Sequence, residues 1–310
     1  MAAQGARGET ARQMTVAMGD TPDGIVRSFA PVTVRLRAEG RPYELSVANA
    51  LWVERTFALR PAYADSVTAR WNAGVFDADF VGAAEAARAS INRWVEERTH
   101  DRIRELVPRG ALTSLTRLVL ANAVYFRGKW QAPFRVAATK PGPFTRANGT
   151  KTEVPLMHAP LFHGRFVAFS GVRLLEMPYR GGDLSMLVIL PDRPDGLAGV
   201  VRRLDAARLE GWLGEMRART VDVVLPRFRI ESRHELRAAL SALGMPIAFD
   251  PARADFSGIS EAAGPGRLFV SAVIHKAFVD VQEEGTEAAA ATAAVVTASS
   301  VVAELGKEKP

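Results

Sequence analysis

The feature that most constrains the fold is a run of small residues near the end of the chain, directly after a strand-like segment. Residues 272–280 form an apolar segment with polar residues at His275, Lys276 and Asp280, which predicts a strand. They are followed by Val281-Gln282-Glu283-Glu284-Gly285-Thr286-Glu287 and then by residues 288–296, which are all alanine, threonine or valine. A strand therefore leads into a long segment that carries almost no bulky side chain.

The small-residue run is compatible with two structures. Alanine is the best helix former, so a surface helix or a low-complexity tail is the simpler interpretation. In an extended chain every second residue lies on one face, and here that face carries only small side chains: Thr286, Ala288, Ala290, Thr292 and Ala294. Such a face can lie between existing strands. Gly285 follows two glutamates, where a chain that leaves a strand needs a flexible residue.

Composition excludes several classes of protein. The chain has 310 residues, 48% of them hydrophobic, which is ample for a core, and no cysteine, so it has no disulfide, thiol nucleophile or cysteine-based metal site. The first residues lack the apolar core of a signal peptide, and no apolar run is long enough to span a membrane. We therefore expect no membrane partner. The compartment stays open between cytoplasmic and extracellular.

The positive net charge does not predict a nucleic-acid partner. The charge is +6, but the basic residues are scattered along the chain and form no dense stripe among aromatics. Six of the 40 basic residues are lysines, and alanine is abundant. This bias points to a GC-rich bacterial genome and says little about partners.

Hydrophobic periodicity predicts a single α+β domain with large, mostly antiparallel sheets. Helices are expected around residues 8–14, 86–106, 196–216 and 236–243, and another helix is expected to begin at residues 60–63. Strands are expected at residues 32–36, 43–52, 115–126, 154–157, 166–169, 173–177, 184–190 and 221–228. Gly181-Gly182-Asp183 is a strong hairpin signal, Thr10 is a candidate helix cap, and Gly244 is expected to end a helix.

Motifs of catalysis and of metal or nucleotide binding do not occur. The five histidines include no pair at i, i+4, and no tight His/Asp/Glu cluster is present, so we expect no metal and no cofactor. There is no Gly-x-Ser-x-Gly elbow, P-loop or dinucleotide fingerprint. A catalytic triad scattered along the chain leaves no such motif. Still, nothing in the residues favours an enzyme over a binding protein.

Several motifs occur in the order that is found in the serpins, a family of serine protease inhibitors. Residues 91–99 resemble the helix that crosses the central sheet of that fold, and residues 122–130 resemble a strand of that sheet with its following turn. Residues 225–228, 240–244 and 254–259 match another family block, and 275–279 lead into the hinge. From about Gly5 to its last residues the chain is thus similar to a serpin, with surrounding helices and an exposed reactive loop.

The resemblance implies a mechanism and a partner. A serpin offers its loop to a serine protease, sometimes a cysteine protease, which forms an acyl-enzyme with it. The cut loop then inserts into the central sheet and distorts the protease before the ester is hydrolysed. The chain is accordingly expected to be a suicide substrate and not an enzyme. Its driving free energy would come from a metastable starting state.

The resemblance also assigns roles to five residues around the opening of the sheet. Glu283 matches the acidic hinge residue and Arg227 its basic partner, although the residues alone predict only an exposed ion pair worth little. Trp130 matches the aromatic residue at the same opening and would otherwise be read as core. Asn122 and His275 match a polar pair that must separate during insertion. The residues alone predict only that His275 is a buried histidine with its hydrogen bonds made.

The hinge and the scissile bond follow from the same comparison. The hinge comprises Glu283, Glu284, Gly285, Thr286, Glu287, Ala288, Ala289, Ala290, Ala291 and Thr292. Family spacing places the scissile bond near Ser299–Ser300, with an uncertainty of one or two residues. The small residues there suit the shallow pocket of an elastase-like or subtilisin-like protease, because a trypsin-like target would require Arg or Lys.

Both ends of the chain depart from the family pattern. A complete serpin has further helices and a strand before the segment that matches Gly5–Met14, and further strands after the reactive loop. We therefore expect residues 1–310 to form an incomplete serpin domain, with the reactive loop within 283–310. Open sheet edges would make it poorly stable or prone to aggregation. The alternative function is that of a non-inhibitory or remnant serpin-like binding protein.

Overall fold

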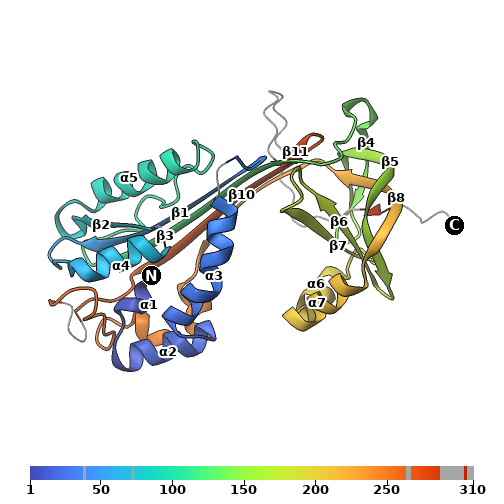
Figure 1. Ribbon diagram of the computed structural model, residues 1–310. Coiled ribbons are helices and arrows are strands. Elements are labelled where there is room, and N and C mark those ends of the chain that lie inside the picture. The colour runs from blue at the N-terminus through green and yellow to red at the C-terminus, as the bar shows by residue number, and fades with distance from the viewer. Residues whose placement is uncertain (38–39, 72, 263–266, 287–303, 306–310) are drawn as a thin grey trace. The chain divides into compact units, whose positions relative to one another are not determined.

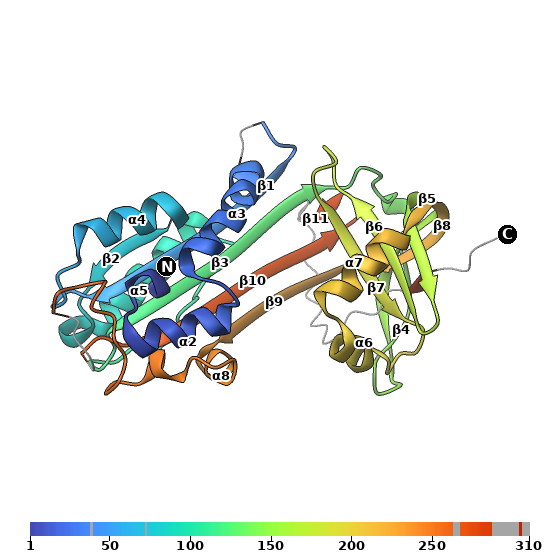
Figure 2. The same ribbon diagram turned by 60° about the horizontal axis from the view of Figure 1, so that its bottom comes forward.

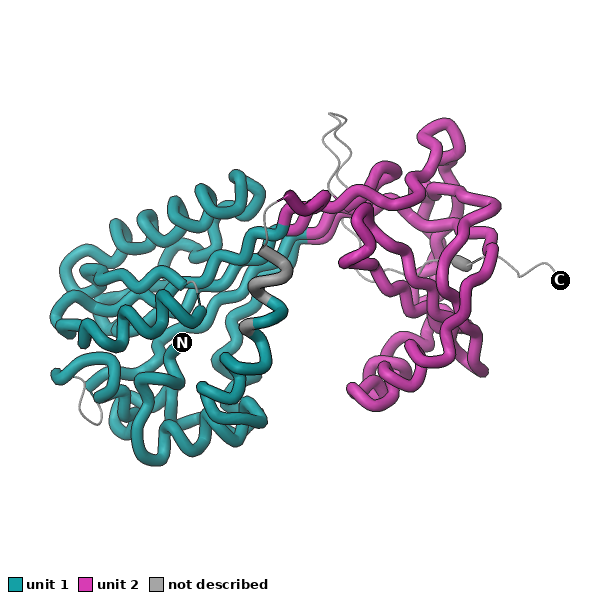
Figure 3. The backbone as a smooth tube through the Cα atoms, viewed as in Figure 1, with its two compact units in different colours: residues 1–39, 45–125, 231–278 teal, residues 40–44, 126–230, 279–310 magenta. Residues whose placement is uncertain are grey.

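The computed structural model describes residues 1–37, 40–71, 73–262, 267–286 and 304–305 (Figure 1). These residues divide into two compact units (Figure 3). Unit 1 comprises residues 1–39, 45–125 and 231–278, and unit 2 comprises residues 40–44, 126–230 and 279–310. The chain passes from one unit to the other within strands β1 (Tyr43–Glu54), β3 (Leu118–Lys129), β9 (Phe228–Glu235) and β10 (Ala272–Gln282).

Unit 1 is built on the larger part of a six-stranded sheet with the order β2-β1-β3-β11-β10-β9. Strands β1 and β2 (Gly74–Ala78) are parallel, as are β3 and β10. Its helices are α1 (Ala2–Gly5), α2 (Gly8–Met18), α3 (Pro22–Arg37), α4 (Pro61–Trp71), α5 (Phe80–Arg98) and α8 (Arg237–Ala242), with a short 3-10 turn at Pro246–Phe249.

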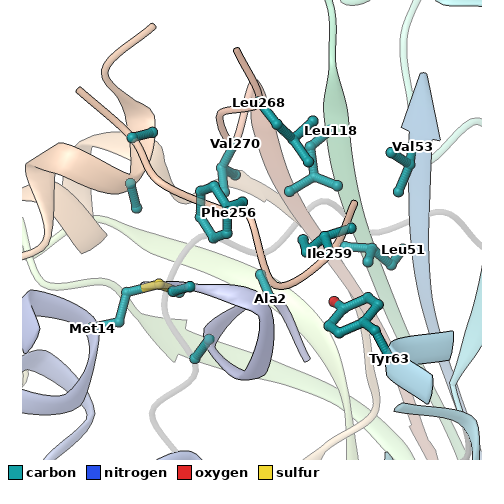
Figure 4. Close-up of a cluster of buried hydrophobic side chains, with 14 of the residues drawn as sticks. Ala2, Met14, Leu51, Val53, Tyr63, Leu118, Phe256, Ile259, Leu268 and Val270 are labelled. Atoms are coloured by element: carbon teal, nitrogen blue, oxygen red, sulfur yellow. The ribbon is translucent and has the colours of Figure 1, made fainter. Parts of the chain in front are cut away.

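The two faces of this sheet bury separate cores because successive side chains of a strand point to opposite faces. In β1, Leu51 and Val53 contribute to one core, together with α1, α2 and α4 (Figure 4). Ala50 and Trp52 contribute to the other core, which α5 covers (Figure 1). Burying one such Leu or Val side chain contributes about 1.5–3 kcal/mol.

The segment that follows α5 is fastened to the sheet. The Asn92 side chain donates to the carbonyl of Val107 (2.9 Å) and accepts from its amide (2.8 Å). Lys276 of β10 is buried and donates from Nζ to the carbonyl of Arg104 (2.6 Å), while its ammonium lies 2.5 Å from Glu231. The positive φ angles of His100, Asp101 and Glu105 show that this segment is a folded loop and no continuation of the helix.

Unit 2 is built on an antiparallel sheet with the order β12-β8-β5-β6-β7, in which β4 also pairs with β5. Its strands are β4 (Lys140–Thr145), β5 (Lys151–Phe169), β6 (Val172–Pro178), β7 (Ser185–Pro191), β8 (Arg217–Pro226), β11 (Gly285–Thr286) and β12 (Glu304–Leu305). Helices α6 (Leu197–Arg203) and α7 (Ala206–Glu215) and a 3-10 turn at Val136–Ala138 complete it.

Most expected elements are present. The strands expected at residues 154–157 and 166–169 are parts of one strand, β5, and the helix expected at 196–216 is divided into α6 and α7. Three further expectations are wrong. Residues 32–36 belong to α3 and form no strand. The helix predicted at 86–106 is α5, which starts at Phe80 and ends at Arg98. Thr10 caps no helix, because its buried hydroxyl accepts from the amide of Asp255 (2.9 Å). The hairpin at Gly181-Gly182-Asp183 joins β6 to β7, and Gly244 follows α8 with φ of 106°.

Candidate functional site: the hinge of the reactive loop

The first part of the predicted hinge already lies within the central sheet. Strand β11 pairs antiparallel with β3, where Gly285 faces Lys129 and Thr286 faces Gly128. On its other side β11 pairs antiparallel with β10, through Val281 and Gln282. Figure 2 shows β11 beside the ends of β3 and β10. Thus a two-residue segment occupies the position of an additional strand between β3 and β10.

Gly285 is required there by close approach of the backbone. A Cβ atom on this residue would lie 2.1 Å from the carbonyl oxygen of Gly128 and 2.7 Å from Cα of Lys129. Its φ is not in the left-handed region, since Gly285 is absent from the positive-φ glycines of the described residues. The sequence argument for a freely rotating glycine therefore identified the right residue for a different physical reason.

Thr286 is anchored by a tyrosine from the β6–β7 turn. Its Oγ1 lies 2.6 Å from the hydroxyl of Tyr179, and both side chains are buried. Burial raises the pKa of Tyr179 to about 12, so its phenol is protonated at neutral pH. The hinge is thus held by a side-chain hydrogen bond in addition to the strand pairing.

Glu283 has two side-chain partners. Its Oε1 accepts a 2.8 Å hydrogen bond from Thr139 Oγ1, and the same oxygen lies 3.8 Å from Nη1 of Arg227. The Glu283 side chain is only 7% exposed. The pair of Glu283 and Arg227 therefore differs from the exposed ion pair that the residues alone predicted. The backbone is also fixed, since the amide of Phe134 donates to the carbonyl of Glu283 (2.9 Å).

Trp130 binds the start of the hinge and the residue before it. Its indole Nε1 donates to the carbonyl of Gln282 (2.9 Å), and its amide donates to the carbonyl of Glu284 (2.9 Å). The ring is buried and stacks on Tyr179, with centroids 4.5 Å apart and planes 11° from parallel. Trp130 is therefore both a core residue and a contact of the hinge.

Asn122 and His275 form the second group, within unit 1. They face one another in the parallel register of β3 and β10, and His275 Nδ1 lies 2.5 Å from Asn122 Oδ1. The Asn122 amide donates to Oδ1 of Asn49 on β1 (2.6 Å). Burial, and to a smaller extent the nearby His234, lowers the pKa of His275. The three side chains link neighbouring strands of the sheet.

The described residues thus bring together Arg227, Glu283 and Trp130, and separately Asn122 and His275. The hinge residues 287–292 and the predicted scissile pair Ser299 and Ser300 lie outside the described residues. Sequence reasoning missed Tyr179, Thr139 and Asn49. Tyr179 and Thr139 lie more than 100 residues from the hinge and belong to no motif, so no spacing could have identified them.

The part of the chain that the structure describes shows neither a metal-binding cluster nor a membrane-spanning helix. Among the residues that the structure describes, no group of three His, Cys, Asp or Glu side chains is placed to bind a metal ion. Within the same residues, no helix combines the length and apolar character that crossing a membrane requires.

Comparison with known proteins identifies the family of this chain. Residues 1–309 match the family model for the serpins, described as serine protease inhibitors. The chain belongs to the serpin family, and it is an inhibitor of serine proteases and not an enzyme. The family assignment and the α+β fold expected from the motifs are therefore confirmed.

Individual relatives agree with this assignment. The chain is 39% identical over 307 residues to the leukocyte elastase inhibitor of Bos taurus, which covers 97% of this chain and 80% of the relative. It is 38% identical over 284 residues to human Serpin B3. It is also 38% identical over 295 residues to the protein Iris of Ixodes ricinus. These relatives come from animals, so the bacterial origin inferred from the arginine bias stays a prediction.

Solved structures show the same fold. Uncleaved ovalbumin matches with a TM-score of 0.84 at 29% identity, covering 92% of this chain and 77% of that chain. An Arabidopsis serpin in its native stressed conformation matches with a TM-score of 0.82 at 29% identity, covering 94% and 77%. Human thyroxine-binding globulin in complex with its hormone matches with a TM-score of 0.84 at 26% identity, covering 94% and 78%.

Proposed function

We propose that this serpin inhibits its target as a suicide substrate, through cleavage of the loop within 283–310 and insertion of that loop into the central sheet. The observation that carries the proposal is β11. Gly285 and Thr286 already pair with both β3 and β10, in the orientation that an inserted strand would continue. In an extended strand that continues β11, the next residues on the Thr286 face are Ala288, Ala290 and Thr292.

The reaction is that of a serine protease, and it stops at the acyl-enzyme ester. The protease serine attacks the carbonyl carbon of the scissile peptide, the C–N bond breaks, and the amine leaves with a proton. An ester then joins the loop to the protease. Insertion removes the ester from the geometry needed for attack by water. The inhibitor contributes position and stored free energy and no catalytic group.

The target that fits best has a shallow, uncharged primary pocket. The proposed scissile pair is Ser299–Ser300, with Thr297 and Ala298 before it. A cationic residue at this position would favour a trypsin-like protease, and the loop has none before Lys307. The names of several relatives refer to leukocyte elastase, which supports an elastase-like target. A cysteine protease is a secondary candidate.

The test is a protease complex that survives denaturation. Mixed with an elastase, the chain should form a covalent species that persists on a denaturing gel, and mass spectrometry should locate the cut near residues 297–301. The variants Ala288→Arg and Ala289→Arg form a matched pair. The first places a large cation on the inserting face, and we expect cleavage without a complex. The second places the same charge on the opposite face, and the complex should remain.

A binding function is the second candidate, because one of the matched structures is a hormone carrier with the same fold. Cleavage of the natural chain by elastase-like, subtilisin-like and cysteine proteases without any stable complex would favour this candidate. A complex with any one of these proteases would exclude it as the sole function and would identify the class of target.

A further inference from the structure

We propose that Tyr179 is a positioning residue of the inhibitory reaction, which holds the hinge in its partly inserted state through the hydroxyl of Thr286. The inference rests on the proposed loop insertion. It goes further because it assigns a role to a residue on the β6–β7 turn that no sequence motif includes. The role is to fix the first two inserted residues before any protease arrives.

The contact is short and excluded from water. Tyr179 Oη and Thr286 Oγ1 are 2.6 Å apart, and the two residues are 4% and 2% exposed. Each hydroxyl therefore depends on the other, because water cannot replace a partner at a buried site. A hinge that moved out of the sheet would leave the Tyr179 hydroxyl without this partner.

Tyr179 is itself held in place from several directions. Its ring stacks on Trp130 and meets Phe126 edge-on at 4.9 Å. Its amide donates to the carbonyl of Leu184 (2.9 Å), and the next amide, of Arg180, donates to the carbonyl of Lys129 (2.8 Å). A rigid tyrosine positions Thr286 more closely than a mobile side chain would.

The turn that carries Tyr179 is also supported by the segment 40–44. Gly181 has φ of 91°, and a Cβ atom there would lie 2.4 Å from Pro42. Arg41 forms an ion pair of 2.5 Å with Asp183 in the same turn. A close contact and an ion pair therefore fix the turn that carries Tyr179. Because Tyr179 holds Thr286, segment 40–44 also helps to set the position of the hinge.

The experiment is a double-mutant cycle with two readouts. The variants are Tyr179→Phe, Thr286→Val and the combination of both. The first readout is hydrogen exchange of the peptide that contains Gly285 and Thr286 in the uncleaved protein. The second is the number of inhibitor molecules consumed per protease molecule inhibited, measured with a protease that the natural chain inhibits. Tyr43→Phe is the matched control, because the buried Tyr43 hydroxyl has no hydrogen-bond partner among the described residues.

Each single variant leaves one buried hydroxyl unpaired, so exchange of the hinge amides should become about tenfold faster. The stoichiometry of inhibition should rise about two- to tenfold, since a hinge that has left the sheet inserts later and gives water time to hydrolyse the ester. The double variant should be no worse than either single variant, because it leaves no unpaired hydroxyl. Tyr43→Phe should change neither readout.

The two readouts separate failure of this inference from failure of the proposed function. If the natural chain inhibits a protease and Tyr179→Phe changes neither exchange nor stoichiometry, Tyr179 has no positioning role. Additive effects in the double variant would also overturn the inference. If the natural chain forms no complex but the exchange pattern is as expected, the hinge contact stands and the proposed suicide-substrate mechanism is wrong.

Discussion

Thr139 Oγ1 lies 2.8 Å from the carboxylate of Glu283, closer than the guanidinium of Arg227 at 3.8 Å. The family pattern drew attention to the charged pair, whereas the shortest side-chain contact of this carboxylate comes from a hydroxyl beyond the 3-10 turn. Since the Glu283 side chain is nearly inaccessible to water, its hydrogen bond cannot be replaced by solvent.

Replacing Thr139 by valine should therefore lower the stability of unit 2. The substitution keeps the shape and removes the donor, so a cost of about 1–3 kcal/mol is expected, seen as a lower urea midpoint. Thr150→Val is the control, because Thr150 is exposed and its hydroxyl bonds only to Asn148 at the surface. Equal midpoints for the two variants would show that the Thr139 contact carries no stability.

Gly285→Ala should prevent β11 from pairing. The added methyl group would lie 2.1 Å from a backbone oxygen of β3, and a backbone atom cannot rotate away as a side chain can. The hinge must leave the sheet, so the variant should consume more inhibitor per protease molecule and should expose the indole of Trp130, which shifts its fluorescence to longer wavelength.

The control for this glycine is Gly211→Ala in α7. No atom lies within 4 Å of a Cβ at that position, and alanine favours a helix over glycine by about 0.5–1 kcal/mol. Gly211→Ala should thus be neutral or stabilising and should inhibit normally. A Gly285→Ala variant that behaves like Gly211→Ala would contradict the placement of β11.

The burial of His275 should make the stability of the chain depend on pH. The pKa of His275 in the folded chain is below its ordinary value of 6.5, chiefly because of burial. The unfolded chain therefore binds the proton more tightly in the interval between the two pKa values. Stability is fully present above pH 6.5, and it decreases as the pH falls through the folded pKa.

This dependence can be measured as the urea midpoint between pH 7.5 and pH 5. His275→Gln keeps a side chain that can bond to Asn122 and removes the titration, so its midpoint should decrease less over this range. His163→Gln, at an exposed position of β5, should keep the dependence of the natural chain. If the slopes of the natural chain and of His275→Gln are the same, His275 is not the titrating group.

Glu54 should be a main support of α5. It is fully buried, and its carboxylate accepts from the amides of Phe80 (2.7 Å) and Val81 (3.1 Å) at the start of that helix. Glu54→Ala leaves these amides without this acceptor, so we expect a loss of about 2–4 kcal/mol in the free energy of unfolding. Asp79→Ala removes the cap on the amide of Gly82 and an ion pair with the exposed Arg55 (3.0 Å), which together cost about 1–2 kcal/mol. A smaller effect for Glu54→Ala would contradict this ranking.

Sequence reasoning predicted the parts of the fold that depend on local patterns. The alternation at residues 43–52, the Gly-Gly turn after Tyr179 and the apolar stripe on α5 all correspond to observed elements. It failed where tertiary contacts override local preference. The β-branched residues at 32–36 favour a strand, yet they extend α3. Ile103 and Leu106 continue the helical spacing of α5, but they belong to the loop after the helix, and their side chains are buried in the core.

The site shows the same limit. The family motifs located Glu283, Arg227 and Trp130, since these residues lie within recognisable segments of the chain. The partners Tyr179 and Thr139 are defined only by the path of the backbone through unit 2. A hydroxyl at the correct place leaves no periodicity and no spacing in the sequence, so only three-dimensional coordinates could identify it.

Asn92 of α5 holds the segment after the helix through two hydrogen bonds to Val107. The same segment contributes the fully buried side chains of Ile103 and Leu106 to the core that α5 covers. Loss of the Asn92 amide would therefore loosen this core together with the segment, at a free energy below that of global unfolding. One asparagine thereby couples the lifetime of the segment to the lifetime of the core beneath α5.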